Sequence, residues 1–111
     1  MSQFQCLVQE ASIADTNRSE LEARLTALHT DHYPGESSSF TWIPISSGYM
    51  FTEGAQSTSS IVACFLDHQT TLAGRERYMR DVCDVWTELT DCTDHEVVVT
   101  ITETDSTNQE R

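Results

Sequence analysis

The chain has 111 residues, enough for one domain with one hydrophobic core. Acidic residues outnumber basic ones by 18 to 6, the formal net charge is −12 at pH 7, and every basic residue is an arginine. This charge repels phosphate backbones and anionic lipid head groups, so we expect neither nucleic acid nor a membrane surface as a partner. Residues 1–11 lack the basic and apolar regions of a signal peptide, and no apolar run approaches the roughly 18 residues of a membrane span.

The four cysteines form no C-x-x-C pair and fall mostly in apolar periodic segments, where a free thiol behaves as a small hydrophobic group. They are Cys6, Cys64, Cys83 and Cys92. This usage favours a reducing compartment, so we expect a cytoplasmic protein that does not need disulfides.

The first half of the chain predicts a strand, a helix and a second strand. Phe4, Cys6 and Val8 alternate with Gln3, Gln5 and Gln9, which is the period of a strand. The segment Asp15-Thr16-Asn17 offers N-cap residues at the start of a helix, and Glu20 lies three residues after Asn17, as in a capping box. Pro34-Gly35 ends that helix. Its apolar stripe consists of Leu21, Leu25, Leu28 and His32. The second strand is expected over Phe40–Ile45, and Pro44 within it indicates a sheet edge or a bulge.

Two turns, 46–48 and 52–54, follow around the short apolar piece Tyr49–Phe51. The second half then repeats the plan. Ile61–Leu66 is a continuous apolar run, as in a strand that is buried on both faces. Gly74 precedes a helix, and the last strand is expected over His95–Thr102. The apolar stripe of the second helix consists of Tyr78, Val82, Val85 and Leu89.

An ungapped shift of 58 positions aligns the apolar residues of the two halves, as when Cys6 falls on Cys64 and Leu25 falls on Cys83. The predicted fold is therefore α+β, with a duplicated β-α-β unit (βαββαβ). Right-handed crossovers place both helices on one face of a four-stranded mixed sheet. We expect a single domain over residues 1–104, with halves of about 1–46 and 58–104, and a polar tail over 105–111.

Two helices cover only one face of such a sheet. The last two strands are apolar at successive positions, so the other face is expected to be an association surface. We therefore expect a homo-oligomer that packs sheet against sheet.

Three segments in this order resemble the tautomerase superfamily, in particular the branch that contains cis-3-chloroacrylic acid dehalogenase. They are Leu21-x-x-x-Leu25-Thr26-x-x-His29, Gly48-x-x-Phe51-x-x-Gly54 and Ala73-Gly74-Arg75. The resemblance implies a tautomerase-like fold, a homotrimer of double units and an active site at the start of the first strand. In that family an amino-terminal proline, exposed by removal of methionine, serves as the base or acid.

This sequence has Ser2 in place of the proline. If Met1 is removed, the Ser2 amino group is a primary amine with an ordinary pKa of about 8, which can still serve as a weak base. The resemblance gives His29 a role in binding substrate or water, and Arg75 a role in binding a substrate carboxylate. A satisfied helix histidine and a surface ion pair are the ordinary alternatives.

Other parts of the family pattern are missing. Leu72 stands where the branch has a second carboxylate-binding arginine, and Thr100 and the end of the chain at Arg111 replace its water-activating tyrosine and glutamate. Met50 and Phe51 are the expected apolar walls of the site. The resemblance therefore predicts weak or altered activity on a small carboxylate or keto-enol acid, with no cofactor.

Two further readings stay open. One is a non-catalytic homo-oligomeric binding or regulatory protein that keeps the fold. The other is a ferredoxin-like ligand-binding domain outside the family. A metal site is not expected, because the pairs His29-x-x-His32 and Cys92-x-x-His95 lack further ligands at a recognised spacing.

Overall fold

The computed structural model describes residues 2–9, 15–46, 48–52, 54–56, 59–90 and 97–103. The elements are, in chain order, β1 (Ser2–Gln9), α1 (Asp15–His32), β2 (Ser38–Ile45), β3 (Phe51–Thr52), β4 (Ala55–Gln56), β5 (Ser60–Leu66), α2 (Leu72–Thr90) and β6 (Val97–Glu103).

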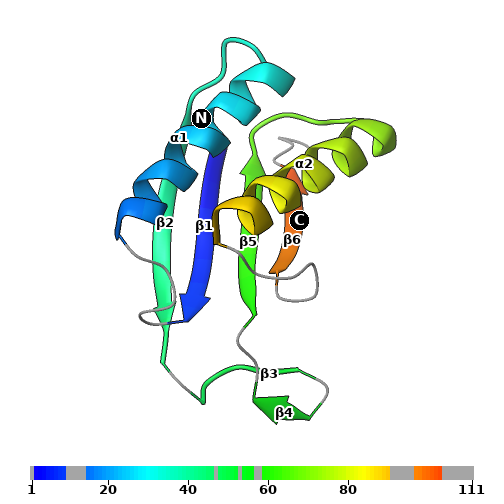
Figure 1. The fold of residues 1–111 in the computed structure, drawn as a ribbon. Helices are drawn as coiled ribbons and strands as arrows, with labels where there is room; N and C mark the ends of the chain where they lie inside the picture. Colours follow the sequence, from blue (N-terminus) through cyan, green and yellow to red (C-terminus); the bar gives the residue numbers. More distant parts are fainter. Residues whose placement is uncertain are drawn as a thin grey trace.

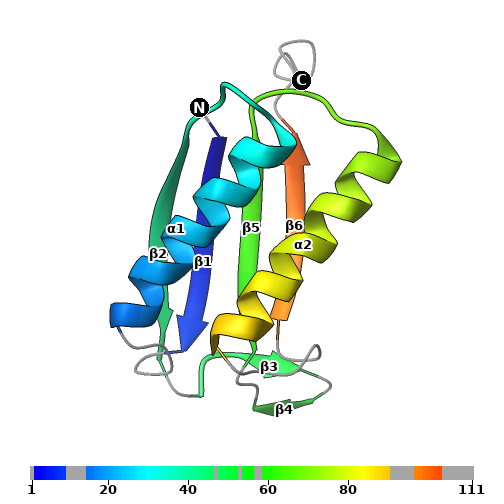
Figure 2. The ribbon, with the colours of Figure 1, turned by 45° about the horizontal axis from the view of Figure 1, so that its top comes forward.

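Four of the strands form one mixed sheet in the order β2-β1-β5-β6 (Figure 1). β1 is parallel to β2 and β5 is parallel to β6, so each β-α-β unit contributes one parallel pair. The two units meet where β1 and β5 run antiparallel. Both helices cover the same face of the sheet (Figure 2). The α+β fold with two helices on one face of a four-stranded mixed sheet is thus confirmed.

The two central strands alternate between the helices and the open face of the sheet. In β1 every second residue, from Ser2 to Val8, is buried, and β5 shows the same alternation from Ser60 to Leu66. Phe4 is 1% exposed and stacks on Phe40 of the neighbouring strand, with ring centroids 4.8 Å apart. The expectation that β5 is buried on both faces is wrong for the single chain, because its alternate residues are only half-buried on the side without helices.

Helix α1 begins at Asp15, so Asn17 lies inside the helix, where its side chain donates to the carbonyl of Leu89 at 3.3 Å. The capping box predicted at Asn17 is therefore wrong. The residue that completes the buried stripe of Leu21 and Leu25 is His29, and His32 is only half-buried. A step of four residues from Leu25 keeps His29 on the buried face of the helix.

The two β-α-β units do not share one constant offset. The shift of 58 positions is correct for the central strands, where Cys6 and Cys64 are both buried. In the sheet, however, Cys6 pairs with Trp42 while Cys64 pairs with Ile101, which is an offset of 59 positions. In the helices the buried stripes are offset by 57 positions. Relative to the central strands, the helix and the last strand of the second unit are therefore each shifted by one residue from their places in the first unit. An ungapped alignment has a single offset and cannot reproduce these shifts.

Strand β2 is an edge strand, as Pro44 predicted. The following segment forms the β3–β4 hairpin, in which Phe51 pairs with Gln56. Gly48 and Gly54 have positive φ angles of 88° and 79°, a conformation that glycine adopts without strain, in agreement with the two predicted turns. The hairpin lies beyond the end of the sheet where β1 finishes (Figures 1 and 2).

The helix-free face carries one apolar row that crosses all four strands. The strand registers place Leu7 beside both Ile43 and Ile61, and Ile61 beside Val98. Ile43 and Val98 are 38% and 49% exposed. The next row toward the start of β1 is centred on Gln5, so only part of this face is apolar.

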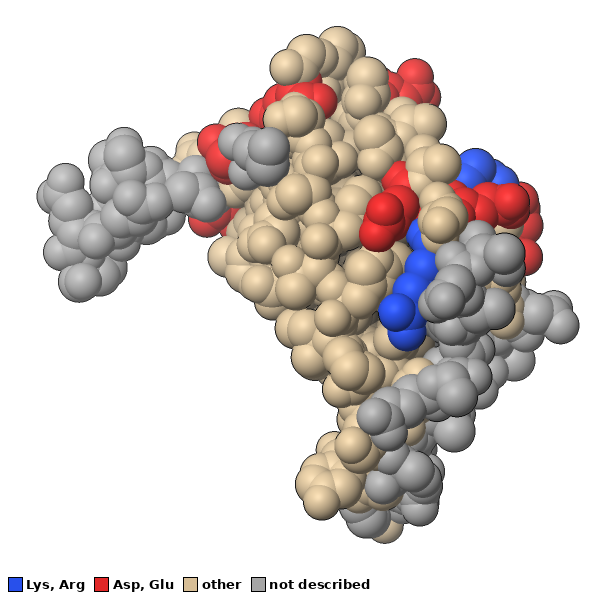
Figure 3. All heavy atoms as spheres, turned by 90° about the vertical axis from the view of Figure 1, so that its left-hand side faces the viewer, with Lys and Arg blue, Asp and Glu red and all other residues tan. Residues whose placement is uncertain are grey.

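Charged side chains are sparse over a broad area of the side that carries β2, in the part drawn from described residues (Figure 3). The strand itself, SSFTWIPI, contains none. Within the described residues, neither helix is long and apolar enough to cross a membrane.

Replacing Leu25 with Ala should lower the free energy of unfolding by about 2–5 kcal/mol, because Leu25 is fully buried and its loss leaves a cavity. Leu72→Ala is the matched control. Leu72 is 65% exposed, so its truncation should change stability by no more than about 0.5 kcal/mol. Urea denaturation measures both, and equal losses would contradict this assignment of the core.

Candidate functional site

Several polar side chains gather at the end of the sheet where β1 begins. Parallel pairing sets Ser2 beside Ser38 at the start of β2, and the backbone N–H of Ser2 donates to the carbonyl of Ser37 at 3.1 Å. Antiparallel pairing brings the end of β5 to the same place, followed in the chain by Asp67 and His68. The two pairings together therefore collect residues from three distant parts of the sequence.

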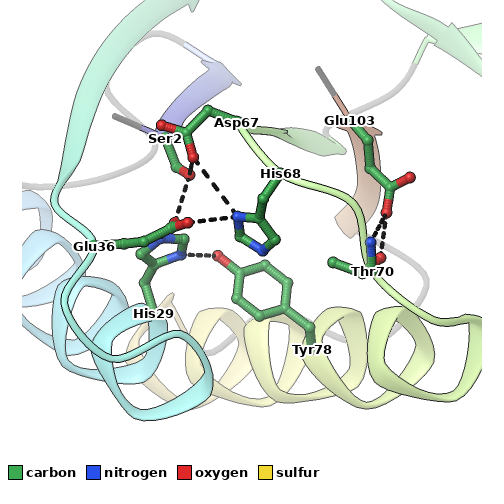
Figure 4. A network of polar contacts seen from close by, with 8 residues as sticks. All are labelled: Ser2, His29, Glu36, Asp67, His68, Thr70, Tyr78 and Glu103. Carbon is green, nitrogen blue, oxygen red and sulfur yellow. Dashed lines mark hydrogen bonds and ion pairs between the residues drawn. The ribbon is translucent and has the colours of Figure 1, made fainter. Parts of the chain in front are cut away.

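Glu36, in the turn between α1 and β2, connects this cluster (Figure 4). The hydroxyl of Ser2 donates to Glu36 Oε1 at 3.0 Å, and Nε2 of His29 lies 2.9 Å from the same oxygen. Nδ1 of His68 lies 2.5 Å from Glu36 Oε2. One carboxylate thus contacts side chains from β1, α1 and the loop after β5.

His29 links the cluster to the core. The side chain is fully buried, and its Nδ1 lies 2.9 Å from the hydroxyl of Tyr78 on α2. Burial, and then neighbouring groups of which Cys64 is the first, raise the pKa of Tyr78, so its hydroxyl stays neutral. A continuous series of polar contacts runs from Ser2 through Glu36 and His29 to Tyr78.

The surroundings of Ser2 are acidic. Its hydroxyl also approaches Asp67 Oδ1, at 3.4 Å, so two carboxylates flank the first residue of β1. Carboxylates at this distance favour a positively charged group beside them and repel an anion. The start of β1 therefore suits a cation better than a free carboxylate.

Arg75 lies at the start of α2, as expected, but its guanidinium already has partners. It donates to the carbonyl of Thr70 at 3.2 Å and to Glu103 Oε2 at 3.3 Å. The hydroxyl and backbone N–H of Thr70 also donate to that carboxylate. In Figure 4 the Thr70–Glu103 pair lies apart from Ser2, on the other side of His68. The structure thus brings Ser2 and His29 together, and joins Arg75 to Glu103.

Tyr33 packs against the histidines of this cluster. Its ring lies 4.4 Å from that of His68 and 5.4 Å from that of His29, measured between centroids. Burial raises the pKa of Tyr33, and the carboxylates of Glu103 and Glu36 raise it further. Among the described residues its buried hydroxyl has no hydrogen-bond partner.

Met50 and Phe51 do not line this cluster within one chain. Strand β3, which contains Phe51, lies at the opposite end of the sheet from Ser2 (Figure 2). Met50 is half-buried there, and the side chain of Phe51 lies outside the described part of the structure. The prediction that the hairpin supplies apolar walls is therefore wrong for a single copy of the chain.

Sequence reasoning missed Glu36, Asp67, His68, Tyr33 and Tyr78. A usable signal was present for three of them. Glu36 directly follows the helix-ending Pro34-Gly35, and Asp67-His68 directly follow the apolar run 61–66. Polar residues immediately after an element are candidates for a site, because loops at the ends of rigid elements carry function.

No protein-family model matches the chain, and no curated protein matches its sequence. Solved structures match over nearly its whole length. Native Ps01740 has a TM-score of 0.88 at 20% identity, covering 95% of this chain and 96% of that chain. N1, a member of the cis-3-chloroacrylic acid dehalogenase family, has a TM-score of 0.87 at 14% identity, covering 96% and 77%. The F6 fused 4-OT asymmetric trimer has a TM-score of 0.83 at 16% identity, covering 95% and 88%. The solved structures that match include tautomerase superfamily members, and at these identities the likeness establishes the fold.

The Glu103 cluster predicts a pH-dependent contribution to stability. The Thr70 hydroxyl first, and then the Thr70 N–H and Arg75, hold the pKa of the Glu103 carboxyl below its ordinary value of 4.5. A carboxyl whose pKa is lower in the folded state stabilises the fold above pH 4.5, and the contribution is lost as pH falls through the folded pKa. Glu103→Gln should therefore lower the free energy of unfolding in urea at pH 7 by less than about 1 kcal/mol, and the difference from wild type should narrow below pH 4.5.

Glu88→Gln is the matched control for this series. Glu88 pairs with Arg24 at 3.1 Å, but the two side chains are 62% and 44% exposed. Solvent screens such a pair, so the control should show no comparable pH dependence. A constant difference between wild type and Glu103→Gln from pH 7 to pH 3 would contradict the assignment.

Proposed function

We propose that this chain, which has the fold of the tautomerase superfamily, acts weakly on a small carboxylate or keto-enol acid by proton transfer at the start of β1. The observation that carries the proposal is the series of contacts from Ser2 through Glu36 to His29 and Tyr78. Proton transfer requires donors and acceptors held at hydrogen-bond distance, and this series supplies them.

The Ser2 amino group, freed by removal of Met1, is the proposed base. In the ketonisation of an enol acid it takes the proton of the enol hydroxyl as the C=O bond forms. The resulting ammonium then gives a proton to the adjacent carbon, which restores the free amine. The contacts of Glu36 and Asp67 with the Ser2 side chain favour the ammonium form. An amine kept protonated is a poor base, which supports weak activity.

His29 and Arg75 are the proposed partners of Ser2. His29 acts through Glu36, because its side chain is fully buried and its Nε2 faces that carboxylate. Arg75 remains the proposed anchor for a substrate carboxylate. The guanidinium of Arg75 would have to contact the substrate while it remains paired with Glu103. One such contact supports an affinity for the carboxylate no better than roughly millimolar.

The second candidate is a non-catalytic homo-oligomeric binding or regulatory protein. Two observations favour it. Glu103 already neutralises Arg75, and the hairpin with the expected apolar walls lies at the far end of the sheet. The apolar row centred on Leu7 offers a surface for association. A homotrimer is the proposed assembly, in line with the trimer named for the similar F6 fused 4-OT structure.

Ketonisation of phenylenolpyruvate distinguishes the two candidates. Native protein should be near the rate without protein, and Ser2→Pro with Met1 removed should raise the rate by up to about 10²-fold, within the range of acid–base catalysis. Ser2→Ala, processed identically and verified by intact mass, is the control and should stay low. A Ser2→Pro protein that stays at background would favour the non-catalytic candidate.

Arg75→Ala should raise KM by about tenfold in the Ser2→Pro background while the chain stays folded, because an ion pair this exposed adds little stability. Arg77→Ala, on the exposed surface of the same helix, is the matched control and should leave KM unchanged. Equal KM values for Arg75→Ala and its parent would remove Arg75 from the site.

Sedimentation at micromolar concentration should show a trimer, and Leu7→Gln should shift it toward monomer. Glutamine already occupies the other outward positions of β1, so the substitution should leave the folded chain intact. Leu72→Gln replaces an exposed leucine on the helix side and should not alter the assembly. A wild-type monomer, or a Leu7→Gln trimer as tight as wild type, would contradict association through this row.

A further inference from the structure

We propose that Glu36, Asp67 and His68 form a binding site for one divalent transition-metal ion of the zinc class. The inference goes beyond the proposed function and does not depend on it, since an ion can bind whether or not the chain turns over a substrate.

The spacing of the side chains fits one ion. The ligand atoms of Glu36, Asp67 and His68 all lie within 4.8 Å of one another. Zinc binds nitrogen and oxygen ligands at about 2.0–2.2 Å, so two ligands on one ion are separated by at most about 4.4 Å. Small side-chain movements therefore suffice to place these three groups around a common centre.

Rigid elements hold the ligands in place. Glu36 lies two residues before β2, and the next residue, Ser37, accepts a hydrogen bond from the N–H of Ser2 at the start of β1. Asp67 and His68 directly follow β5, which pairs with β1. The site therefore needs little ordering when an ion binds, which favours affinity.

His68 supplies an independent observation. Both of its ring nitrogens are buried, and within the described residues neither makes a hydrogen bond of acceptable geometry. Nδ1 lies 2.5 Å from Glu36 Oε2, close enough for an ion pair but poorly aligned for a hydrogen bond. The side chain is 27% exposed, and Nδ1 also lies 3.6 Å from Asp67 Oδ1, so this nitrogen faces both carboxylates. A metal ion at Nδ1 would join the nitrogen to the two carboxylates.

His29 orients the carboxylate of Glu36. Its Nε2 lies 2.9 Å from Glu36 Oε1, and its Nδ1 lies 2.9 Å from the hydroxyl of Tyr78. If the Tyr78 hydroxyl donates to Nδ1, the Nε2–H donates to Glu36, and hydrogen bonds of this kind hold a ligating carboxylate in place. Tyr78 can donate because its buried hydroxyl stays neutral.

The charge and chemistry of the ligands select the class of ion. An imidazole beside two carboxylates suits zinc and its first-row neighbours, whereas calcium and magnesium prefer oxygen ligands alone. Within the described residues, Glu36 contacts the hydroxyl of Ser2 and the rings of His29 and His68, none of which is permanently charged. A dication would balance the carboxylates.

Titration calorimetry of the full chain with zinc chloride tests the site. A Cys83→Ser, Cys92→Ser background removes the cysteines other than buried Cys6 and Cys64, so that thiols do not compete. One ion should bind per chain. Glu36→Gln and His68→Asn should each weaken binding at least about tenfold. Equilibrium dialysis with metal analysis should show the same loss of bound zinc.

Asp81→Asn in the same background is the matched control. Asp81 and His32 form a histidine–carboxylate pair at 2.8 Å between the two helices, of the same chemistry, and no third ligand group joins them among the described residues. This variant should bind zinc as its parent does.

Circular dichroism should confirm that each variant is folded. Asp67→Asn is a second test of the site, because Asp67 is exposed and its replacement should not disturb the fold. Unchanged zinc binding in Glu36→Gln, His68→Asn and Asp67→Asn would overturn the proposal, as would an equal loss in Asp81→Asn.

Discussion

The antiparallel pairing of β1 with β5 is the constraint on which the rest of the structure depends. It joins the two β-α-β units into one sheet, and it fixes which side chains of both central strands face the helices. It also sets the beginning of one strand beside the end of the other. Ser2 consequently lies next to the loop that carries Asp67 and His68, although more than half of the chain separates them. Parallel pairing with β2 adds Glu36 to the same end. The candidate site therefore follows from strand direction, which brings together the connections that carry Glu36, Asp67 and His68.

The electrostatics of this end of the sheet differ from those of a site built to hold an anion. Carboxylates flank the start of β1, and the arginine that the family resemblance assigned to substrate binding is paired with Glu103. In a chain with a net charge of −12, this arrangement favours a positive group at the centre of the cluster. A protonated amino terminus and a metal ion both meet that requirement. The two proposals thus share one physical origin, the carboxylates of Glu36 and Asp67 beside Ser2, and they differ in which cation these carboxylates hold.

The open face of the sheet raises a separate question of assembly. The apolar row around Leu7 crosses every strand, but the glutamines of β1 occupy much of the remaining central surface. Such a mixed face can remain hydrated in a single chain, and its apolar part can still be buried when copies of the chain associate. The hairpin extends beyond the end of the sheet opposite Ser2, so its apolar residues can reach the candidate site only from another copy (Figure 1). The candidate site can therefore gain apolar walls from the hairpin only in a homo-oligomer.

The sequence by itself determined the two β-α-β units, the edge position of β2 and the turns at Gly48 and Gly54. These features follow from period-2 and helical patterns, from the missing N–H of proline and from the backbone freedom of glycine, all of which are local. It also pointed to Ser2 and His29, through the family resemblance. Only the tertiary structure decided the one-residue differences between the units, the burial of His29 in place of His32, and the pairing of Arg75 with Glu103. The cluster around Glu36 was equally beyond the sequence. These outcomes depend on strand register and on contacts between residues far apart in the chain, and no local pattern encodes the side chain that a given residue will meet.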